Sequence, residues 1–298
     1  VVFCFTSRMQ KRHVVTLGIL FFFVLVVWAQ VYEGGIEKSK KESGLLTVAF
    51  LDVGQGDAIY IEAPNGRQMI VDGGPKETLM MELPTVMPFG DKTIDVMMVT
   101  NPDLDHYSGF IPLLEQFDIG VVVEPGTHND FGMYSTLEQK IRDEGAEHIL
   151  ARSGQRIILD QEKNVYFEIL FPDRNVSTWD SNDGSIIGRL VYGDITFLFT
   201  GDSTLLTEGI VVANNDISGI DVLKVGHHGS KTSTGLPLLR EADPEHAVIS
   251  AGAGNRYGHP TKLVLDRLAS FGIETYTTID EGTIVFETDG ELLTRVVN

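Results

Sequence analysis

The stretch TNPDLDHYSG, residues 100–109, places three ionisable side chains within four positions, directly after an apolar run. That run, residues 95–100, predicts a buried strand, and the apolar spacing after it predicts a helix. Asp103, Asp105 and His106 therefore lie on a loop between a strand and a helix, where open α/β architectures place their sites. A helix cap explains one aspartate there, but not three ionisable groups. Carboxylates with an imidazole suit Zn²⁺ or Mn²⁺, so the loop is predicted to bind metal.

Two adjacent histidines follow another predicted strand, in the stretch KVGHHGSK, residues 224–231. His227 and His228 lie between two glycines, which permit unusual backbone angles, and such a pair is atypical of a protein core. The pair predicts metal ligation or catalysis. Ser230 and Lys231 in the same stretch are candidates for holding a phosphate group.

Three further stretches place polar side chains at predicted strand ends. In FTGDS, the carboxylate of Asp202 either caps the following helix or bridges two cations. In AGAGNRYGHP, residues 251–260, Arg256 and His259 are candidates for phosphate contact and proton transfer, with a structured turn as the alternative. Its glycine spacing is not that of a dinucleotide-binding loop. LDVGQGD, residues 51–57, sets two acids beside two glycines, which indicates either a β-bulge or part of a site.

Outward from these stretches, short apolar strands alternate with amphipathic helices. Turn signals around Asn65-Gly66 and Gly193-Asp194 predict two hairpins. Strands are predicted over residues 46–53, 58–63, 67–71, 95–100, 120–123, 165–171, 185–192, 195–200, 221–225, 247–251, 274–278 and 283–287. Helices are predicted over residues 107–117, 135–148, 203–214 and 261–271. This order predicts one α/β domain with two sheets covered by helices on both outer faces.

Composition narrows the functional classes. The chain has 298 residues, of which 43% are hydrophobic, with 31 glycines and 11 prolines. These values exclude a disordered tail, a collagen-like repeat and a polytopic membrane protein. The single cysteine, Cys4, excludes a disulfide framework and a cysteine-rich zinc site. The formal net charge of −19 repels polyanions, so a phosphate polymer would require metal ions or a local basic patch.

The N-terminal residues predict a membrane address. Arg8, Lys11 and Arg12 precede the apolar run over residues 14–29. A positive flank before an apolar run is typical of a signal peptide or an uncleaved signal anchor, and either would place the rest of the chain outside the cytoplasm. A buried core helix is the alternative. The domain organisation is therefore predicted as a signal segment, a Gly-rich linker and one catalytic domain, over residues 1–32, 33–44 and 45–298.

In order and spacing, these five stretches resemble the metallo-β-lactamase-like domain of the ComEC/Rec2 family of competence (DNA-uptake) proteins. The resemblance extends from about residue 46 to residue 286. It implies an αββα four-layer sandwich and a metal-dependent hydrolase, specifically a phosphodiesterase or nuclease. In that family the domain is proposed to degrade the DNA strand that is not imported. The family's multi-span channel region has no counterpart in this sequence, so a membrane-anchored hydrolase with a separate channel protein as partner is expected.

The resemblance also implies metal ligands. The superfamily loop reads His-x-His-x-Asp-His, and here Asn101 and Asp103 stand at the two leading histidine positions. Asp105 and His106 match the last two residues of that loop, and Asp202 matches the bridging carboxylate. A complete second metal site is therefore implied, made of Asp105, His106, Asp202 and one of His227 and His228.

The first metal site departs from the superfamily pattern. The histidine expected within residues 172–185 is absent, and that stretch offers Asn182 and Asp183 instead. The first site then rests on Asp103, Asp202 and one of these two side chains. Oxygen-rich ligation favours Mn²⁺ over Zn²⁺, and either one or two divalent ions fit this sequence.

The expected chemistry is hydrolysis of a phosphodiester, with DNA as the substrate, by metal-activated water. Asp105 would bind the metal and orient the water. His259, or whichever of His227 and His228 is not a ligand, would protonate the leaving oxygen. Lys231 and Arg256 would hold the phosphate.

Three alternatives remain at the level of the sequence. One is a phosphodiesterase for wall polymers, lipids or small nucleotides, which the scarcity of basic residues near the motifs would suit. Another is hydrolysis of a carboxyl or lactam bond, which the Asp-rich first site disfavours. The last is a non-catalytic binding module with a degenerate first metal site.

Overall fold

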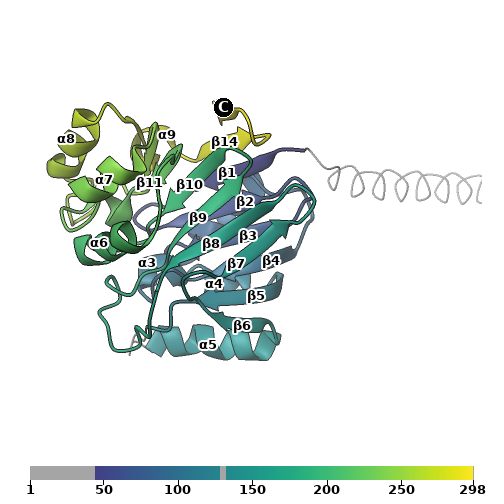
Figure 1. The fold of residues 1–298 in the computed structure, drawn as a ribbon. Coiled ribbons are helices and arrows are strands. Elements are labelled where there is room, and N and C mark those ends of the chain that lie inside the picture. Colours follow the sequence, from purple (N-terminus) through teal and green to yellow (C-terminus); the bar gives the residue numbers. More distant parts are fainter. Residues whose placement is uncertain (1–43, 128–131, 298) are drawn as a thin grey trace, which may run out of the picture. The chain divides into compact units, whose positions relative to one another are not determined.

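The computed structural model describes residues 44–127 and 132–297, and contains two β-sheets with helices packed on them (Figure 1). Both sheets belong to a compact unit formed by residues 42–87 and 91–298. The predicted hydrophobic helix and signal segment, and the predicted linker up to residue 43, lie outside the described residues. Among the helices that are described, none has the length and apolar character needed to cross a membrane.

The first sheet has eight strands, antiparallel on one side of β3 and parallel on the other. In spatial order these are β15 (Leu293–Val296), β14 (Ile284–Thr288), β1 (Leu46–Phe50), β2 (Ala58–Glu62), β3 (Gln68–Gly73), β4 (Thr93–Met98), β5 (Asp118–Glu124) and β6 (Glu147–Leu150). Because β3, β4 and β5 run parallel, their carboxyl ends meet at one edge of the sheet.

The second sheet has seven strands and the same division, with parallel pairing from β10 to β13. In spatial order these are β13 (Glu274–Thr277), β12 (His246–Ile249), β11 (Val222–Lys224), β10 (Ile195–Phe199), β9 (Ile187–Tyr192), β8 (Val165–Phe171) and β7 (Arg156–Asp160). The carboxyl ends of its parallel strands carry the loops with Asp202 and the two histidines.

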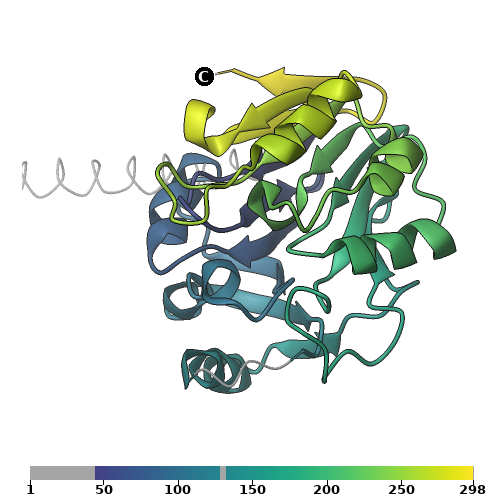
Figure 2. The ribbon, with the colours of Figure 1, turned by 90° about the vertical axis from the view of Figure 1, so that its left-hand side faces the viewer.

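Helices pack on the outer face of each sheet (Figures 1 and 2). On the first sheet these are α2 (Thr78–Glu82), the 3₁₀ turn η1 (Leu83–Thr85), α3 (Leu104–Tyr107), α4 (Phe110–Leu113) and α5 (Gly132–Glu144). On the second they are α6 (Leu205–Asn214), α7 (Leu236–Ala242) and α8 (Lys262–Ser270). The remaining helical elements of the described residues are two short turns, namely η2 (Gly226–Gly229) and α9 (Thr278–Glu281).

Three apolar cores separate the layers. The central core lies between the sheets and is rich in aromatic rings, such as Phe50 stacked on Phe199 at a centroid distance of 6.2 Å. The second core lies between the first sheet and its helices, and the third between the second sheet and its helices. Three cores between four layers confirm the predicted helix–sheet–sheet–helix sandwich.

Several predicted elements differ from the observed ones. The helix predicted over residues 107–117 is not continuous: α3 ends at Tyr107 and α4 covers only Phe110–Leu113, because the backbone N–H of Gly109 donates to the carbonyl of Gly74 and the carbonyl of Asp105 accepts from Asp57. The helix predicted over residues 135–148 ends at Glu144, and a left-handed Gly145 leads directly into β6. Strands β6, β7 and β15 and helices α2, α7 and α9 were absent from the prediction. Most of these are edge strands or single turns, whose apolar patterns are too short to be recognised.

Candidate metal centre

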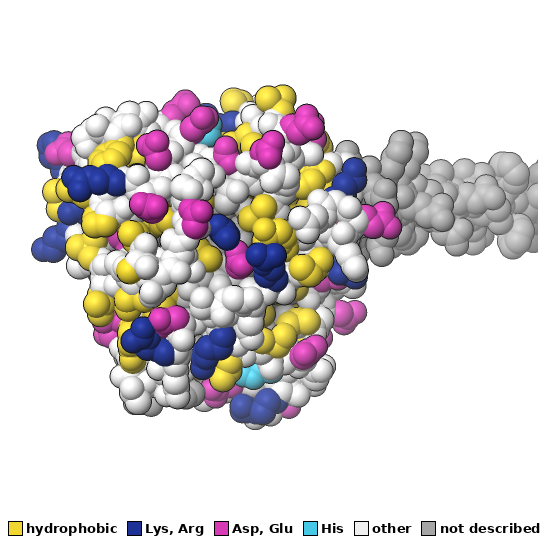
Figure 3. All heavy atoms as spheres, in the orientation of Figure 1, with side chains coloured by type: hydrophobic (Ala, Val, Ile, Leu, Met, Phe, Trp, Pro, Cys, Tyr) yellow, Lys and Arg dark blue, Asp and Glu magenta, His cyan; other side chains and the backbone are white. Residues whose placement is uncertain are grey.

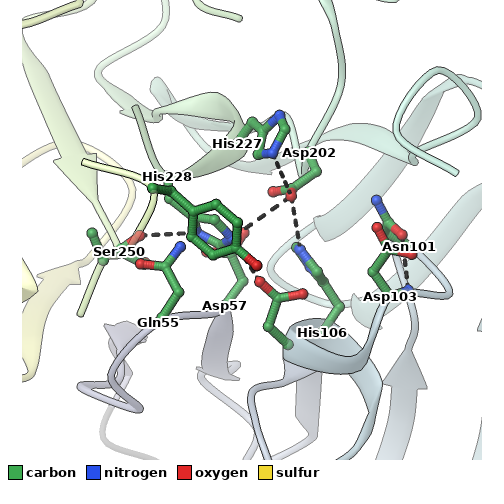
Figure 4. A network of polar contacts seen from close by, with 12 residues as sticks. Gln55, Asp57, Asn101, Asp103, His106, Asp202, His227, His228 and Ser250 are labelled. Atoms are coloured by element: carbon green, nitrogen blue, oxygen red, sulfur yellow. Dashed lines mark hydrogen bonds and ion pairs between the residues drawn. The ribbon is translucent and has the colours of Figure 1, made fainter. Parts of the chain in front are cut away.

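The carboxyl ends of parallel strands from both sheets bring the predicted side chains together (Figure 4). From the first sheet, the helical turn α3 that follows β4 supplies Asp105 and His106, which were predicted from the sequence to lie on a loop before the helix. From the second, the turn after β10 supplies Asp202, and the turn after β11 supplies His227 and His228. The three imidazoles point toward the carboxylate of Asp202. The two half-sites therefore meet only because the sheets pack face to face.

His106 is fully buried and held in one orientation. Its Nδ1 lies 2.8 Å from Oδ2 of Asp72, a carboxylate that itself accepts hydrogen bonds from the backbone N–H and hydroxyl of Thr100. A carboxylate accepts, so in the neutral imidazole the proton lies on Nδ1 and Nε2 keeps the lone pair that a metal ion would bind. That Nε2 lies 3.2 Å from Oδ2 of Asp202. The arrangement of carboxylate, imidazole and free Nε2 is typical of a metal-binding histidine.

His228 has the same arrangement on the other side. Its Nδ1 lies 3.0 Å from the carbonyl oxygen of Ser250 and 3.3 Å from Oδ1 of Asp57, both of which are acceptors. Its Nε2 faces Oδ2 of Asp105 at 3.4 Å and Oδ2 of Asp202 at 3.6 Å. The side chain of His227 is 23% exposed, and its Nε2 also lies 3.6 Å from Oδ2 of Asp202. Burial and orientation therefore distinguish the two histidines.

The donor atoms of this cluster fit a cation. Nε2 of His106, Nε2 of His228 and Oδ1 of Asp202 are buried and have no hydrogen-bond partner within the described chain. Ligand atoms of Asp105, His106 and His228 lie within 4.8 Å of one another, as do those of Asp57, Asp202 and His228. Unpaired buried lone pairs are costly unless a cation binds them. Two imidazoles and two carboxylates suit a borderline divalent metal.

Proton affinities in the cluster show the same attraction for positive charge. Burial alone would lower the pKa of His228, but the carboxylates of Asp202 and Asp57 raise it to about 10. Asp202 and Asp72 likewise raise the pKa of His106 well above its usual range, against the effect of burial. Burial would raise the pKa of Asp202, but the charges of His106 and His228 hold it well below its usual range. Protons and a divalent cation therefore compete for the same sites.

An ion pair, Lys224 with Asp57, and a carboxylate, Asp72, are buried behind the cluster. No specific role was predicted from the sequence for any of the three. Nζ of Lys224 lies 2.5 Å from Oδ2 of Asp57, and both side chains are almost fully buried. Burial would raise the pKa of Asp57, but Lys224 and then His228 lower it to about 2. The other overlooked residue is Asp72, which orients His106. The signal for it was a carboxylate before two glycines at the end of an apolar strand, in IVDGG.

The residues predicted for a first metal site hydrogen-bond among themselves and their neighbours. Nδ2 of Asn101 donates to Oδ1 of Asn182 at 2.7 Å, and Oδ1 of Asn101 accepts from the backbone N–H of Asp103. The hydroxyl of Ser181 donates to Oδ2 of Asp103. Asp183 accepts at Oδ1 from the hydroxyl of Thr204. The groups of side chains arranged to hold a metal, among described residues, contain neither Asp103 nor Asp183.

The remaining predicted residues fall in different places. Arg256 lines a cleft of about 560 Å³ beside Asp103 and Asp105. The ring of His259 lies 5.6 Å from the ring of His227, and burial followed by the charges of His227 and His228 lowers the pKa of His259. Lys231 is exposed and is not among the residues that line the cleft. The structure therefore brings Arg256 and His259 to the site and leaves Lys231 outside the cleft.

The backbone around the histidines is strained. His227 and His228 both have left-handed backbone angles, with φ of 47° and 53°. Such angles are uncommon for residues other than glycine and cost roughly 1–3 kcal/mol each, and they cluster at functional sites. The loop that follows is anchored by Glu208 of α6, whose carboxylate accepts from the backbone N–H groups of Thr234 at 2.5 Å and Gly235 at 2.8 Å.

Glu208 should make stability depend on pH. Burial raises its pKa from 4.5 to about 7, although the two backbone hydrogen bonds lower it. The folded state then keeps a proton that the unfolded state releases, so the free energy of unfolding should fall as the pH rises between these values. The loss is on the order of 3 kcal/mol. Glu208→Gln should remove this part of the pH dependence in urea unfolding between pH 5 and pH 8. Equal pH slopes for the two proteins would contradict the assignment.

Gly56 of the LDVGQGD stretch determines how closely that stretch approaches the metal-binding loop. Its φ is +146°, and a Cβ there would lie 2.3 Å from the carbonyl oxygen of Asp105. We therefore expect Gly56→Ala to displace Asp105, to destabilise the fold by roughly 1–3 kcal/mol and to weaken metal binding in a titration. Gly54→Ala is the matched control, because Gly54 has a φ of +78° with open space around it. Equal metal affinity in both variants would refute the role of the close contact.

Comparison with known proteins shows the family to which this chain belongs. The Metallo-beta-lactamase superfamily profile matches residues 51–253. ComE operon protein 3 of Bacillus subtilis is 31% identical, over 80% of this chain and 32% of that protein. Competence protein ComA of Neisseria gonorrhoeae is 30% identical, over 80% and 32% respectively. Recombination protein 2 of Haemophilus influenzae is 30% identical, over 78% and 28%. The chain therefore spans about a third of the length of the curated relatives that it matches.

Solved structures show the same fold at low sequence identity. A mutant of the β-hydroxylase CmlA superposes with a TM-score of 0.53 and 11% identity, over 80% of this chain and 53% of that chain. A long-form RNase Z from yeast superposes with a TM-score of 0.50 and 12% identity, over 83% and 42% respectively. At these identities the similarity concerns the fold alone.

Proposed function

The chain belongs to the metallo-β-lactamase superfamily, and on that basis we propose that it is a metal-dependent phosphodiesterase that cleaves DNA. The observation that carries the proposal is the convergence of buried, unpartnered donor atoms of His106, His228 and Asp202 beside Asp105. Similarity to competence proteins, and the earlier resemblance to the DNA-uptake family, support DNA as the substrate. We further propose that residues 45–298 are the catalytic domain, exported and held at the membrane by the preceding segment.

We assign four residues to hold the metal, namely Asp105, His106, Asp202 and His228. A bound divalent cation lowers the pKa of a water molecule toward ~7 and stabilises charge on phosphoryl oxygens. Asp72 and the carbonyl of Ser250 hold the two imidazoles so that each Nε2 faces the carboxylate of Asp202. The hydrogen-bonded amides of Asn101 and Asn182 occupy the first-site positions, so a single ion suits this arrangement better than two.

The substrate side of the site is formed by basic and titratable groups. Arg256 is placed to bind a phosphate oxygen, since it lines the cleft and lies near enough to Asp105 to respond to its charge. We assign to His259, whose ring lies 5.6 Å from that of His227, the exchange of a proton with the leaving oxygen. Acidic and basic side chains are interspersed over the face shown in Figure 3. In a chain of net charge −19, a bound cation therefore supplies much of the local attraction for phosphate.

The proposal is tested by metal content and substrate preference together. The full chain, purified without chelator, should contain about one divalent ion per molecule, and should cleave DNA or bis-p-nitrophenyl phosphate with Mn²⁺ or Zn²⁺. Treatment with a chelator should abolish cleavage, and the metal should restore it. Cleavage of only a wall polymer, a phospholipid or a cyclic dinucleotide would replace DNA with that substrate. If the protein binds no metal and cleaves no phosphodiester, the proposed enzyme is refuted and a non-catalytic binding module is the remaining interpretation.

A further inference from the structure

The cleft beside the metal centre is lined by Asp105 and Arg256, which already have proposed roles, and also by Gln55, Lys76 and Tyr257, which have none at the metal. Its volume of about 560 Å³ lies within the range of small-molecule sites, roughly 300–1,000 Å³. Asp103 and Asp105 line it toward the metal centre, and the cations Lys76 and Arg256 also line it. Leu104, Met133 and Tyr257 add apolar surface. A binding site with both cationic and apolar walls suits a ligand that carries phosphate and a flat apolar group together.

Tyr257 is the flat apolar wall of this cleft. Its side chain is 53% exposed, so part of the ring is accessible to a ligand in the cleft. The guanidinium of Arg256 lies 4.8 Å from the ring centroid and donates a hydrogen bond to the tyrosine hydroxyl at 2.7 Å. The His259 ring stacks on it at 5.7 Å with an interplanar angle of 22°. An exposed aromatic ring beside a guanidinium is the arrangement that binds a nucleobase by stacking and its phosphate by charge.

The loop that carries Tyr257 is held in one conformation by hydrogen bonds and close packing. The Asn255 side chain accepts hydrogen bonds from the backbone N–H groups of Tyr257 and His259, and donates to the carbonyls of Gly252 and His259. A Cβ on Gly252 would lie 2.6 Å from the backbone nitrogen of Gln55, so this loop packs tightly on the LDVGQGD stretch. A platform held in this way loses little conformational entropy on binding.

Gln55 supplies a further donor at the same cleft. Its Oε1 accepts from the backbone N–H of Gly252 at 3.2 Å, which orients the amide group. Gln55 is one of the residues that line the cleft, and its Nε2 is buried and has no hydrogen-bond partner within the residues that the structure describes. A buried N–H without an acceptor is costly, and a ligand oxygen would remove that cost.

We propose that this cleft is a nucleotide subsite, in which Tyr257 stacks on an unpaired base next to the scissile phosphate. Lys76 and Arg256 would bind the flanking phosphates, and Gln55 would donate to a ligand oxygen. In a duplex the base faces are covered by their neighbours, so only a single strand or a frayed end can reach this platform. The inference rests on the proposed phosphodiesterase function, and assigns it unpaired polynucleotide as the substrate class.

The test compares a single-stranded oligonucleotide with an abasic strand of the same length, which keeps the phosphates and lacks the bases. Tyr257→Ala in the full chain should raise KM for the normal strand about tenfold, since stacking contributes ~1–3 kcal/mol per base, and should leave KM for the abasic strand unchanged. Tyr257→Phe keeps the aromatic face and loses only the hydroxyl that accepts from Arg256, so it should raise KM for the normal strand much less than Tyr257→Ala does. Arg256→Ala should raise KM for the normal strand and for the abasic strand by the same factor. Fluorescence anisotropy with an uncleavable phosphorothioate strand should give the same ranking without reference to activity.

Tyr166→Ala is the matched control, because Tyr166 of β8 carries a similar guanidinium, that of Arg156, at 4.6 Å and is not among the residues lining the cleft. Should Tyr257→Ala misfold, Tyr257→Leu keeps the bulk and removes the stacking. Equal losses on the normal and abasic strands, or no loss on either, would overturn the subsite while wild-type cleavage of DNA upholds the phosphodiesterase. If the wild type cleaves other phosphodiesters but no polynucleotide, the subsite and DNA as the substrate are overturned, while the phosphodiesterase is upheld. Failure of the wild type on every phosphodiester would overturn both.

Discussion

Asp202→Ala is expected to lower the rate of phosphodiester cleavage by ~10³-fold or more, equivalent to about 4 kcal/mol of transition-state stabilisation. The carboxylate lies within 3.6 Å of an Nε2 atom of His106, His227 and His228, so every imidazole of the cluster faces it. Removing it takes away one proposed ligand and the charge that attracts the cation. Metal content should therefore fall together with activity, as measured by mass spectrometry of the purified protein.

Asp160→Ala serves as the matched control for a lost buried carboxylate. Asp160 is 4% exposed and accepts hydrogen bonds from the backbone N–H groups of Glu162 and Lys163, in the turn after β7. Its loss should cost about 1 kcal/mol of stability and leave metal content and turnover unchanged. An Asp202→Ala protein that keeps its metal and more than a tenth of its activity would refute the assigned centre.

Lys224→Met is expected to destabilise the fold by ~3–5 kcal/mol, because it leaves the Asp57 carboxylate buried without its partner. The two side chains are 1% and 2% exposed, and Nζ donates to Oδ2 at 2.5 Å. Asp57 also lies 3.3 Å from Nδ1 of His228, so the metal centre should loosen as well. Urea unfolding measures the first effect, and a metal titration measures the second.

A double-mutant cycle identifies the cause. Lys224→Met combined with Asp57→Asn should be more stable than Lys224→Met alone, since the second change removes the unpaired buried charge. Lys262→Met is the control for an exposed pair, because Lys262 and Asp266 are 85% and 61% exposed, and its cost should lie within about 1 kcal/mol. Strictly additive losses in the cycle would show that the Lys224–Asp57 contact carries no interaction energy.

Much of the site was readable from the sequence because its residues occur in short, dense motifs. Asp105, His106, Asp202 and the histidine pair each stand beside a predicted strand end, and the structure places all of them together. The αββα order of the layers was also predicted, both from the alternation of strands and helices and from the family resemblance. Strand β8 was predicted with its observed limits, because a buried apolar run bounded by turns is a local signal.

The predictions that failed or were missing depend on contacts between distant parts of the chain. The break between α3 and α4 lies where Gly109 packs against Gly73, and these two residues are separated in the chain by β4 and α3. Edge strands such as β6 and β7 have weak apolar patterns of their own and gain their structure from the neighbour that they pair with. The hydrogen bond that Asp183 accepts from Thr204 likewise follows from packing against the turn before α6, and no local pattern around Asp183 indicates it.

The sequence by itself determined which chemical groups this protein offers, and that they occur at strand ends, because those patterns are encoded within a few neighbouring residues. Only the tertiary structure decided how they are paired. Lys224 and Asp57 are 167 residues apart in the chain, and Asp72 and His106 are 34 apart. The order and packing of the strands bring such residues together, and burial then makes each of these pairings obligatory, because an unpaired charge in the interior costs more than the fold can tolerate.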